Sequence, residues 1–507
     1  MRPLSTLARL LRFAGLAALS VACIWGQGSS LQNSGLQYLQ TINIPTWKTP
    51  GTAGNANVDL FGYNPVTRTM YLADRTSHGI TVIDTHTNVV VGLIPLPTKA
   101  VPNVPLVAIN LQQLVVSDGL QSVYVWDLRA PQAQPDIYTF PDSMGSVTDG
   151  MAYDPINQTV YVVTDNPPEY LIGINLPFKK VVTQVPLPVS SDLIAWNPTD
   201  GKVYISAEDA DGSDNNANAG VYSFDPATGA APVQVVKVGP PCPGHGIDID
   251  PVSNVAVVGC AAIPPPPSGQ PGVIAVDLTA GKVLNTFNDI TGTDTVVFNP
   301  DVRRFYTGSG LNTASTSGCP SPKPGPFGAS VPILGMVDSS GGSSKLIEGV
   351  ACAGGGHVAG VDTRTNFVYV PVSQYPPDPN ATTTGSAGVL VFRDNTPPAQ
   401  ALLTQASATL AGVGNNSAAG TVQMTLINNR IRVTAGPTGL PSGTQAAWLV
   451  VPTTVANEFV ACAVNDANLS AVCNEDLIGQ PLVGATVTLS ADGNAVARGK
   501  IALPSSH

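Results

Sequence analysis

Six residues that can ligate a metal ion recur at one position of a repeating pattern along the chain. Each lies five residues before an Asn or Asp that is usually followed by Pro, as in Tyr63-Asn64-Pro65 and Tyr153-Asp154-Pro155. If the repeats surround a common axis, equivalent positions of successive repeats form a ring. The seven positions are Asp59, Pro105, Asp149, Asp192, His245, Asp294 and His357.

Carboxylates combined with imidazole can ligate Ca²⁺, Mn²⁺ or Zn²⁺. The pattern is therefore compatible with one divalent cation at the ring, with ligands drawn from all six side chains: Asp59, Asp149, Asp192, His245, Asp294 and His357. A structural role is the alternative, because a small polar residue at the start of a strand can cap a turn or bond a neighbouring backbone. Like charges that converge need a cation, protonation or partners, and the residue types alone leave both interpretations open.

The elements around these residues have the pattern of short strands. Each Asn or Asp is followed by a β-branched or aromatic run such as Met70-Tyr71-Leu72, and then by a third run that commonly ends in an acidic residue, such as Thr81-Val82-Ile83-Asp84. The anchors Asn64, Asn110, Asp154, Asn197, Asp250, Asn299 and Asp362 are 43 to 63 residues apart. Strand patterns with such a period are typical of propeller blades, and they predict an all-β, seven-bladed β-propeller over residues 36–393. The seventh unit lacks a fourth strand, so we expect the strand near residues 38–45 to close the ring and remove the free sheet edges.

The strand Val160-Tyr161-Val162-Val163-Thr164 resembles the motif of the YVTN-type repeat family of bacterial, exported β-propellers. The resemblance covers residues 36–393 and implies the propeller fold. It implies no particular activity, because propellers host binding proteins, scaffolds and many enzymes.

The N-terminus predicts export. Residues 1–22 combine three arginines with the apolar run from Phe13 to Ala22 and a small-residue cleavage site, as a signal peptide does. The next residue is Cys23, so attachment to a membrane is expected only if this cysteine is lipidated. The predicted location is periplasmic, cell-surface or secreted.

The charge balance excludes some partners. Removal of Arg2, Arg9 and Arg12 with the signal peptide leaves 20 of the 23 basic residues against 34 acidic ones. An acidic chain is a poor ligand for nucleic acid. The sequence contains no haem-attachment or phosphate-binding motif, so neither haem nor nucleotide is expected as a cofactor. The partner is predicted to be an unidentified protein or small molecule.

Six cysteines remain after Cys23 is set aside, and an even number in an exported chain indicates disulfides. Sequential pairing is favoured because each pair brackets loops of the same or adjacent repeats. The predicted pairs are Cys242–Cys260, Cys319–Cys352 and Cys462–Cys473.

The repeat ends before the C-terminus. Residues 394–401 form a predicted linker, and residues 402–507 contain alternating runs that predict a small β-sandwich. Its role is not indicated by the sequence.

Two functions remain open. The loops between second and third strands are long in units 4 to 7 and are expected on the face that carries the ring, which favours a binding or scaffold propeller. The alternative is a metal-dependent hydrolase of the lactonase kind, in which His245 or His357 is the candidate general base and the four aspartates hold the metal.

Overall fold

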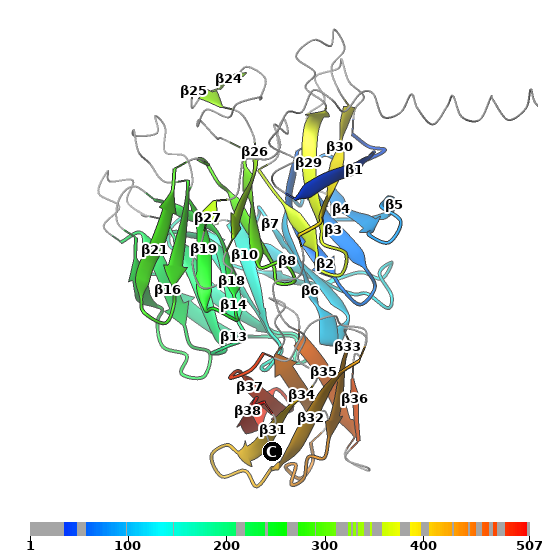
Figure 1. The fold of residues 1–507 in the computed structure, drawn as a ribbon, viewed down its shortest axis with the longest axis vertical. Helices are drawn as coiled ribbons and strands as arrows, with labels where there is room; N and C mark the ends of the chain where they lie inside the picture. The colour runs from blue at the N-terminus through cyan, green and yellow to red at the C-terminus, as the bar shows by residue number, and fades with distance from the viewer. Residues whose placement is uncertain are drawn as a thin grey trace, which may run out of the picture.

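The computed structural model places seven four-stranded antiparallel sheets around an axis and a separate C-terminal sheet beneath them (Figure 1). The all-β, seven-bladed prediction is therefore confirmed. The structure describes residues 35–47, 57–97, 99–145, 147–208, 218–238, 242–260, 272–288, 290–310, 323–325, 328–330, 333–338, 345–346, 357–375, 386–396, 405–427, 430–444, 447–452, 459–465, 470–473 and 482–503.

The blades follow one another along the chain, and each begins with its innermost strand. Blades 1 to 3 contain β2 (Val58–Asn64), β3 (Thr69–Asp74), β4 (Gly79–Asp84) and β5 (Val89–Pro95); β6 (Pro102–Ala108), β7 (Gln113–Asp118), β8 (Ser122–Asp127) and β9 (Asp136–Thr139); and β10 (Val147–Asp154), β11 (Thr159–Asp165), β12 (Tyr170–Asn175) and β13 (Lys180–Pro186). Blades 4 to 6 contain β14 (Ser191–Asn197), β15 (Lys202–Ala207), β16 (Gly220–Phe224) and β17 (Val233–Lys237); β18 (Gly244–Asp250), β19 (Val255–Cys260), β20 (Val273–Asp277) and β21 (Lys282–Phe287); and β22 (Thr295–Asn299), β23 (Arg304–Ser309), β26 (Ile333–Asp338) and β27 (Lys345–Leu346). A short hairpin, β24 (Lys323–Gly325) and β25 (Gly328–Ser330), lies between β23 and β26.

The seventh blade is completed by the N-terminal strand. It contains β28 (Gly360–Asp362), β29 (Phe367–Tyr375) and β30 (Ser386–Asp394), and its outer strand is β1 (Leu36–Ile42). Leu36 pairs with Asp394 and Ile42 pairs with Val389 in an antiparallel ladder. The expected closure of the ring by the N-terminal strand is confirmed.

The recurring Asn or Asp is explained by the turn after each inner strand. Its side-chain oxygen accepts a hydrogen bond from the backbone amide two residues later, which is an Asx turn. Examples are Asp154 with Ile156 at 2.8 Å and Asn197 with Thr199 at 3.0 Å. The same bond follows the other anchors except Asn110: Asn64, Asp250, Asn299 and Asp362.

Blade 2 departs from this pattern. The residue of β6 that takes the place of Asn64 is Ala108, because Ala108 pairs with Gln113 as Asn64 pairs with Thr69. A 3-10 turn, η1 (Ile109–Leu111), replaces the Asx turn. Asn110 accepts a hydrogen bond from the Tyr153 hydroxyl at 2.7 Å instead.

The C-terminal module is one curled sheet of eight strands. Its order is β33 (Arg430–Ala435), β32 (Gly420–Ile427), β31 (Gln405–Gly412), β38 (Asn494–Lys500), β37 (Thr486–Ala491), β34 (Ala447–Pro452), β35 (Phe459–Asn465) and β36 (Ser470–Cys473). Strand β31 pairs with β32 along its first part and with β38 at its end, so it joins two layers that share one core. The sequence predicted a small β-sandwich, and the structure shows an all-β module made of one curled sheet.

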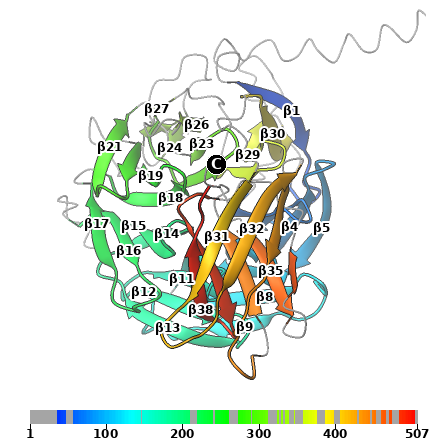
Figure 2. The same cartoon turned by 60° about the horizontal axis from the view of Figure 1, so that its bottom comes forward.

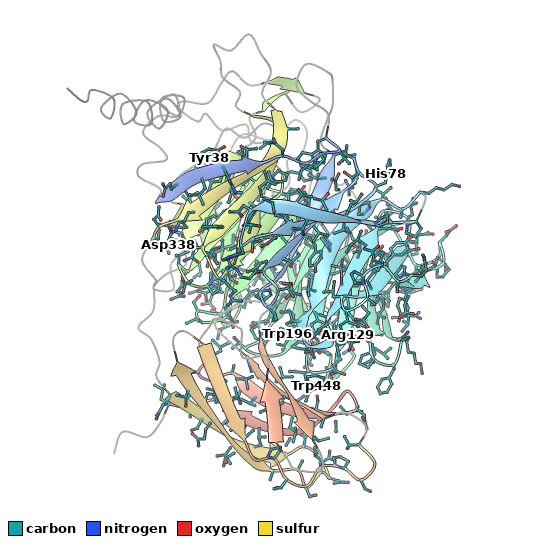
Figure 3. All side chains as sticks on the ribbon, turned by 90° about the vertical axis from the view of Figure 1, so that its right-hand side faces the viewer. Tyr38, His78, Arg129, Trp196, Asp338 and Trp448 are labelled. Atoms are coloured by element: carbon teal, nitrogen blue, oxygen red, sulfur yellow. A yellow bond between two sulfur atoms is a disulfide. The ribbon has the colours of Figure 1, made fainter. Side chains whose placement is uncertain are left out.

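This module packs against the face of the propeller that carries the Asx turns (Figures 2 and 3). Val450 is fully buried in the core of the neighbouring blades, and Trp448 packs against the same core. The tip at Gly493 lies near Asn175 and Phe178 of blade 3. Since the inner strands run through the propeller to these turns, their starting ends lie on the opposite face. No helix among the residues described above is long and apolar enough to cross a membrane.

Candidate metal centre

A β-bulge at the start of the inner strand positions four of the six predicted ring residues, whereas Asp294 and His357 lie just before β22 and β28, which have no such bulge. In blade 4, for example, Ser191 pairs with Ala207 and Ile194 pairs with Ile205. The two residues between them on the inner strand, Asp192 and Leu193, therefore oppose the single residue Ser206. A bulge of this kind redirects the side chain of the extra residue. The first residues of the five bulges are Asp59, Asn103, Asp149, Asp192 and His245.

The register corrects one predicted ring position. Pro105 pairs with Val116 below the bulge, and Asn103 takes the place that Asp59 has in blade 1. The prediction was wrong by two residues because Asn110 is not the structural equivalent of Asn64. Alignment on the second strands would have found Asn103, since Gln113 is as far after Asn103 as Thr69 is after Asp59.

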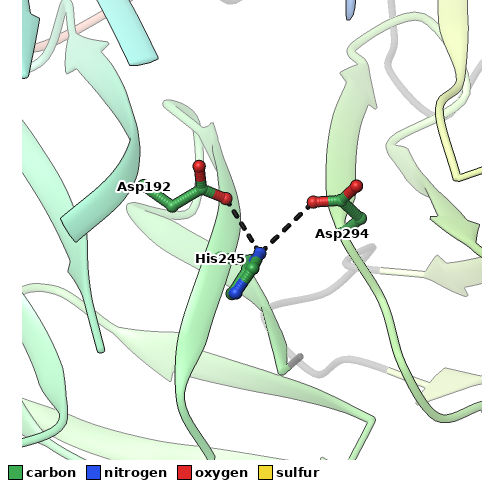
Figure 4. Close-up of side chains that lie close together, drawn as sticks. All are labelled: Asp192, His245 and Asp294. Atoms are coloured by element: carbon green, nitrogen blue, oxygen red, sulfur yellow. Dashed lines mark hydrogen bonds and ion pairs between the residues drawn. The ribbon is translucent and has the colours of Figure 1, made fainter. Parts of the chain in front are cut away.

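His245 lies at the centre of the most compact group (Figure 4). Its Nδ1 atom is 2.9 Å from an Asp192 carboxylate oxygen and 3.3 Å from one of Asp294. Its Nε2 atom contacts the carboxylate of Glu208, a residue just after β15 that was not predicted. The side chains of His245, Asp192 and Asp294 are 27%, 19% and 36% exposed, so solvent reaches the group.

Inner strands approach closely enough to form this group because small residues lie between them. A Cβ atom added to Gly246 would collide with the carbonyl oxygen of Asp294, and one added to Gly150 with that of Asp192. Glycine is the residue that permits such close backbone contact.

The acidic neighbours control the protonation of His245. Burial lowers the pKa of this imidazole, but the charge of Asp192 and hydrogen bonds with Asp192, Asp294 and Glu208 outweigh burial and raise the pKa well above its ordinary value. These neighbours therefore favour the protonated imidazole, which can donate from both nitrogens. A protonated histidine cannot accept a proton, so His245 in this state is not a general base.

The pKa values of the ring aspartates are shifted in different directions. Burial is the largest cause that raises the pKa of Asp192, and it also raises the pKa of Asp149, where repulsion by Asp192 and Asp59 adds to it. Burial acts on Asp294 in the same direction, but the hydrogen bond from His245 and the charges of His357, His245 and Arg75 lower its pKa overall.

In a second part of the ring, an arginine side chain provides a positive charge. Arg75, directly after β3, forms a salt bridge with Asp59 and donates to the Asn103 side chain at 2.5 Å. The Nε2 atom of His357 lies 4.0 Å from Asp59 and 3.8 Å from Asp294, which connects the two parts. Burial raises the pKa of Asp59, and Arg75 opposes that rise. Like Glu208, Arg75 follows a second strand, a position that the inner-strand pattern did not indicate.

The group of Asp192, His245 and Asp294 fits a metal ion. One donor atom from each residue lies within 4.8 Å of the other two. Donor atoms at about 2.0–2.6 Å from a common ion have separations in this range. Binding at this group requires loss of the proton on His245 Nδ1, so a metal and a proton compete for the same nitrogen.

One predicted disulfide is present beside this centre. Cys242 and Cys260 are bonded, both are buried, and they join the segment before β18 to the end of β19. Cys462 and Cys473 are opposite one another in the register of β35 and β36. Cys319, Cys352, Cys23 and the predicted signal peptide are outside the residues that the structure describes, as are most residues of the four long loops.

Comparisons with known proteins do not identify a family. No protein-family model and no curated protein matches the sequence. A chain in the crystal structure of the mitotic checkpoint complex is similar with a TM-score of 0.46 and 10% sequence identity, over 69% of this chain and 95% of that chain. The propeller architecture rests on the seven sheets themselves.

Proposed function

We propose that this chain is an exported binding β-propeller whose axial centre holds one divalent cation and presents it to a ligand or partner. The observation that carries the proposal is the convergence of Asp192, His245 and Asp294, with donor atoms within 4.8 Å of one another. A mixture of two carboxylates and one imidazole favours Mn²⁺ or Zn²⁺ over Ca²⁺. The predicted signal peptide and the resemblance to exported YVTN-type propellers support the assignment to an extracytoplasmic location.

The surroundings of the centre favour binding of a cation over a purely structural role. Six carboxylates lie around the centre, and among the described residues their negative charge is offset by Arg75, His245 and His357. The carboxylates are those of Asp59, Asp149, Asp165, Asp192, Glu208 and Asp294. A divalent cation would relieve the repulsion that raises the pKa of Asp149.

The test is metal binding by the mature full-length protein with its disulfides intact. Titration calorimetry with Mn²⁺, Zn²⁺ and Ca²⁺ is expected to show one site that is lost in Asp192→Asn and His245→Gln. Asp127→Asn is the matched control, because it removes an exposed carboxylate that pairs only locally, with Arg129. Binding that persists in both centre variants, or no binding in the wild type, contradicts the proposal.

A hydrolase of the lactonase kind is the second candidate, and it depends on His357. Both nitrogens of His245 face carboxylates, whereas His357 lies 3.8 Å or more from Asp294 and Asp59. His357 would then be the general base beside the metal. Metal-dependent turnover of a lactone that is lost in His357→Ala would favour the enzyme, and metal binding without turnover favours the binding protein.

A further inference from the structure

A cavity of about 220 Å³ lies along the axis of the propeller, below the acidic centre. Most of the side chains that line it are apolar, among them Leu60, Met151, Leu193 and Phe298, while polar atoms make up nearly half of its surface. An apolar cavity of about 150 Å³ is large enough to bind benzene. This cavity can therefore take a ligand somewhat larger than one aromatic ring.

Asp248 is the one carboxylate among the residues that line this cavity. The register of the inner strands gives the residues equivalent to Asp248 in the other blades, and all of them are small or apolar: Gly62, Leu106, Ala152, Ala195, Val297 and Gly360. Turn formation does not account for Asp248, because the Asx turn of blade 5 is made by Asp250.

The hydrogen bonds of Asp248 leave its charge without a cationic partner among the described residues. One oxygen accepts from the backbone amide of Phe298 at 2.7 Å, and the other accepts from the adjacent amide of Ile249 at 2.8 Å. Burial raises the pKa of this carboxyl to about 7, and only these two amides oppose burial. A buried carboxylate without a counter-ion is a position where a cation binds favourably.

We propose that the cavity binds a small primary ammonium ion with an apolar body, and that Asp248 is its counter-ion. The apolar body would occupy the space between the inner strands, and the ammonium group would donate to the Ile249-bonded oxygen of Asp248. Phe61, Tyr63, Tyr153 and Phe298 line the same cavity and provide aromatic surface for a cation. The C-terminal module packs on the opposite face, so we expect the ligand to enter through the ring of carboxylates, which attracts cations.

The experiment is calorimetric titration of the full chain with benzylammonium, in EDTA so that the axial metal does not contribute. Benzyl alcohol is the neutral probe of the same shape. We expect benzylammonium to bind the wild type, and Asp248→Asn to weaken it by about tenfold or more, because the variant lacks the charge that receives the ammonium group. Benzyl alcohol should bind more weakly and be insensitive to Asp248→Asn.

Leu106→Trp is the second variant, because it fills the cavity at the level of Asp248 and leaves the carboxylate in place. Leu106→Trp is expected to abolish binding of benzylammonium. The control variant Asp127→Asn should bind it as the wild type does. Thermal unfolding checks that each variant is folded. The proposal is overturned if benzylammonium does not bind the wild type, if it binds Leu106→Trp unchanged, or if the two probes bind equally well. Because EDTA is present, these outcomes are independent of whether the axial centre holds a metal.

Discussion

The hydroxyl of Tyr63 donates a hydrogen bond of 2.5 Å to the Asp362 carboxylate, although the two residues belong to the first and the last blade. Both residues occupy positions of the repeating pattern: Tyr63 directly precedes the anchor Asn64 of blade 1, and Asp362 is the anchor of blade 7. Arg68 of blade 1 lies 3.7 Å from the same carboxylate. The turn motif that shapes each blade therefore also joins the two ends of the ring.

Tyr63→Phe tests this contact. We expect the free energy of unfolding to fall by about 1.5–3 kcal/mol, because one hydrogen bond to a buried carboxylate is lost while the amide of Arg364 still donates to it. Urea denaturation followed by fluorescence measures the change. Tyr138→Phe, on the outer strand β9, is the control and should be nearly neutral. Equal stability of Tyr63→Phe and the wild type would show that the contact does not help to close the ring.

Arg75 is expected to weaken cation binding at the axial centre. Its charge is one of the causes that lower the pKa of Asp294, so it acts on a proposed ligand of the metal. Arg75→Gln should increase the affinity for Mn²⁺ by roughly threefold to tenfold at low ionic strength, and salt should reduce the gain. Arg75→Lys keeps the charge and should leave the affinity close to that of the wild type. A similar gain in both variants would show that the effect is not electrostatic.

The stability of the metal-free protein is expected to fall as the pH rises from about 4 to 7. Burial raises the pKa of Glu169 to about 7, from an ordinary value of 4.5, and raises that of Asp248 to about 7. The folded state therefore holds protons that the unfolded state has already lost in this range, and the stability that they provide disappears as the pH passes the folded pKa.

The double variant Glu169→Gln/Asp248→Asn should show a shallower decline over the same range. Thermal unfolding in EDTA at pH 4.5, 6 and 7.5 measures it, with Asp127→Asn as the exposed control. The pKa of that residue is lowered, because its hydrogen bonds with Arg129 outweigh the effect of burial. If the stability of the double variant declines as steeply as that of the wild type, other groups cause the pH dependence.

The disulfide beside the centre is expected to stabilise both the fold and the metal site. Cys242 and Cys260 are 18 residues apart, and a loop of this length corresponds to about 3 kcal/mol of stabilisation. Cys242→Ala/Cys260→Ala should lose about this amount in denaturation experiments. It should also bind Mn²⁺ more weakly, since Cys242 is three residues before His245. Unchanged metal affinity in a folded variant would separate the disulfide from the site.

The sequence predicted the blades well because the Asx turn is local. Asp154 and the amide of Ile156 are two residues apart, so the same residue types recur wherever the turn does. The ring was harder to predict, because the direction of a bulged side chain depends on pairing with a second strand. Asn103 was missed for this reason, and Arg75 and Glu208 reach the ring from the ends of second strands. The raised pKa of His245 follows from contacts between three blades and has no local signal in the sequence.

The pairing of β1 with β30 also determines the order in which the molecule can fold. The strand Leu36–Ile42 is synthesised first, yet its partner Ser386–Asp394 follows almost the whole propeller sequence. The entropic cost of closing a loop rises only slowly with loop length. Closing a loop as long as this one therefore does not prevent the completed ring from being stable. Contacts between residues so far apart in sequence nevertheless form late and slowly. Until the last blade is made, the first strand has no partner, and folding of the propeller ends with the seventh blade.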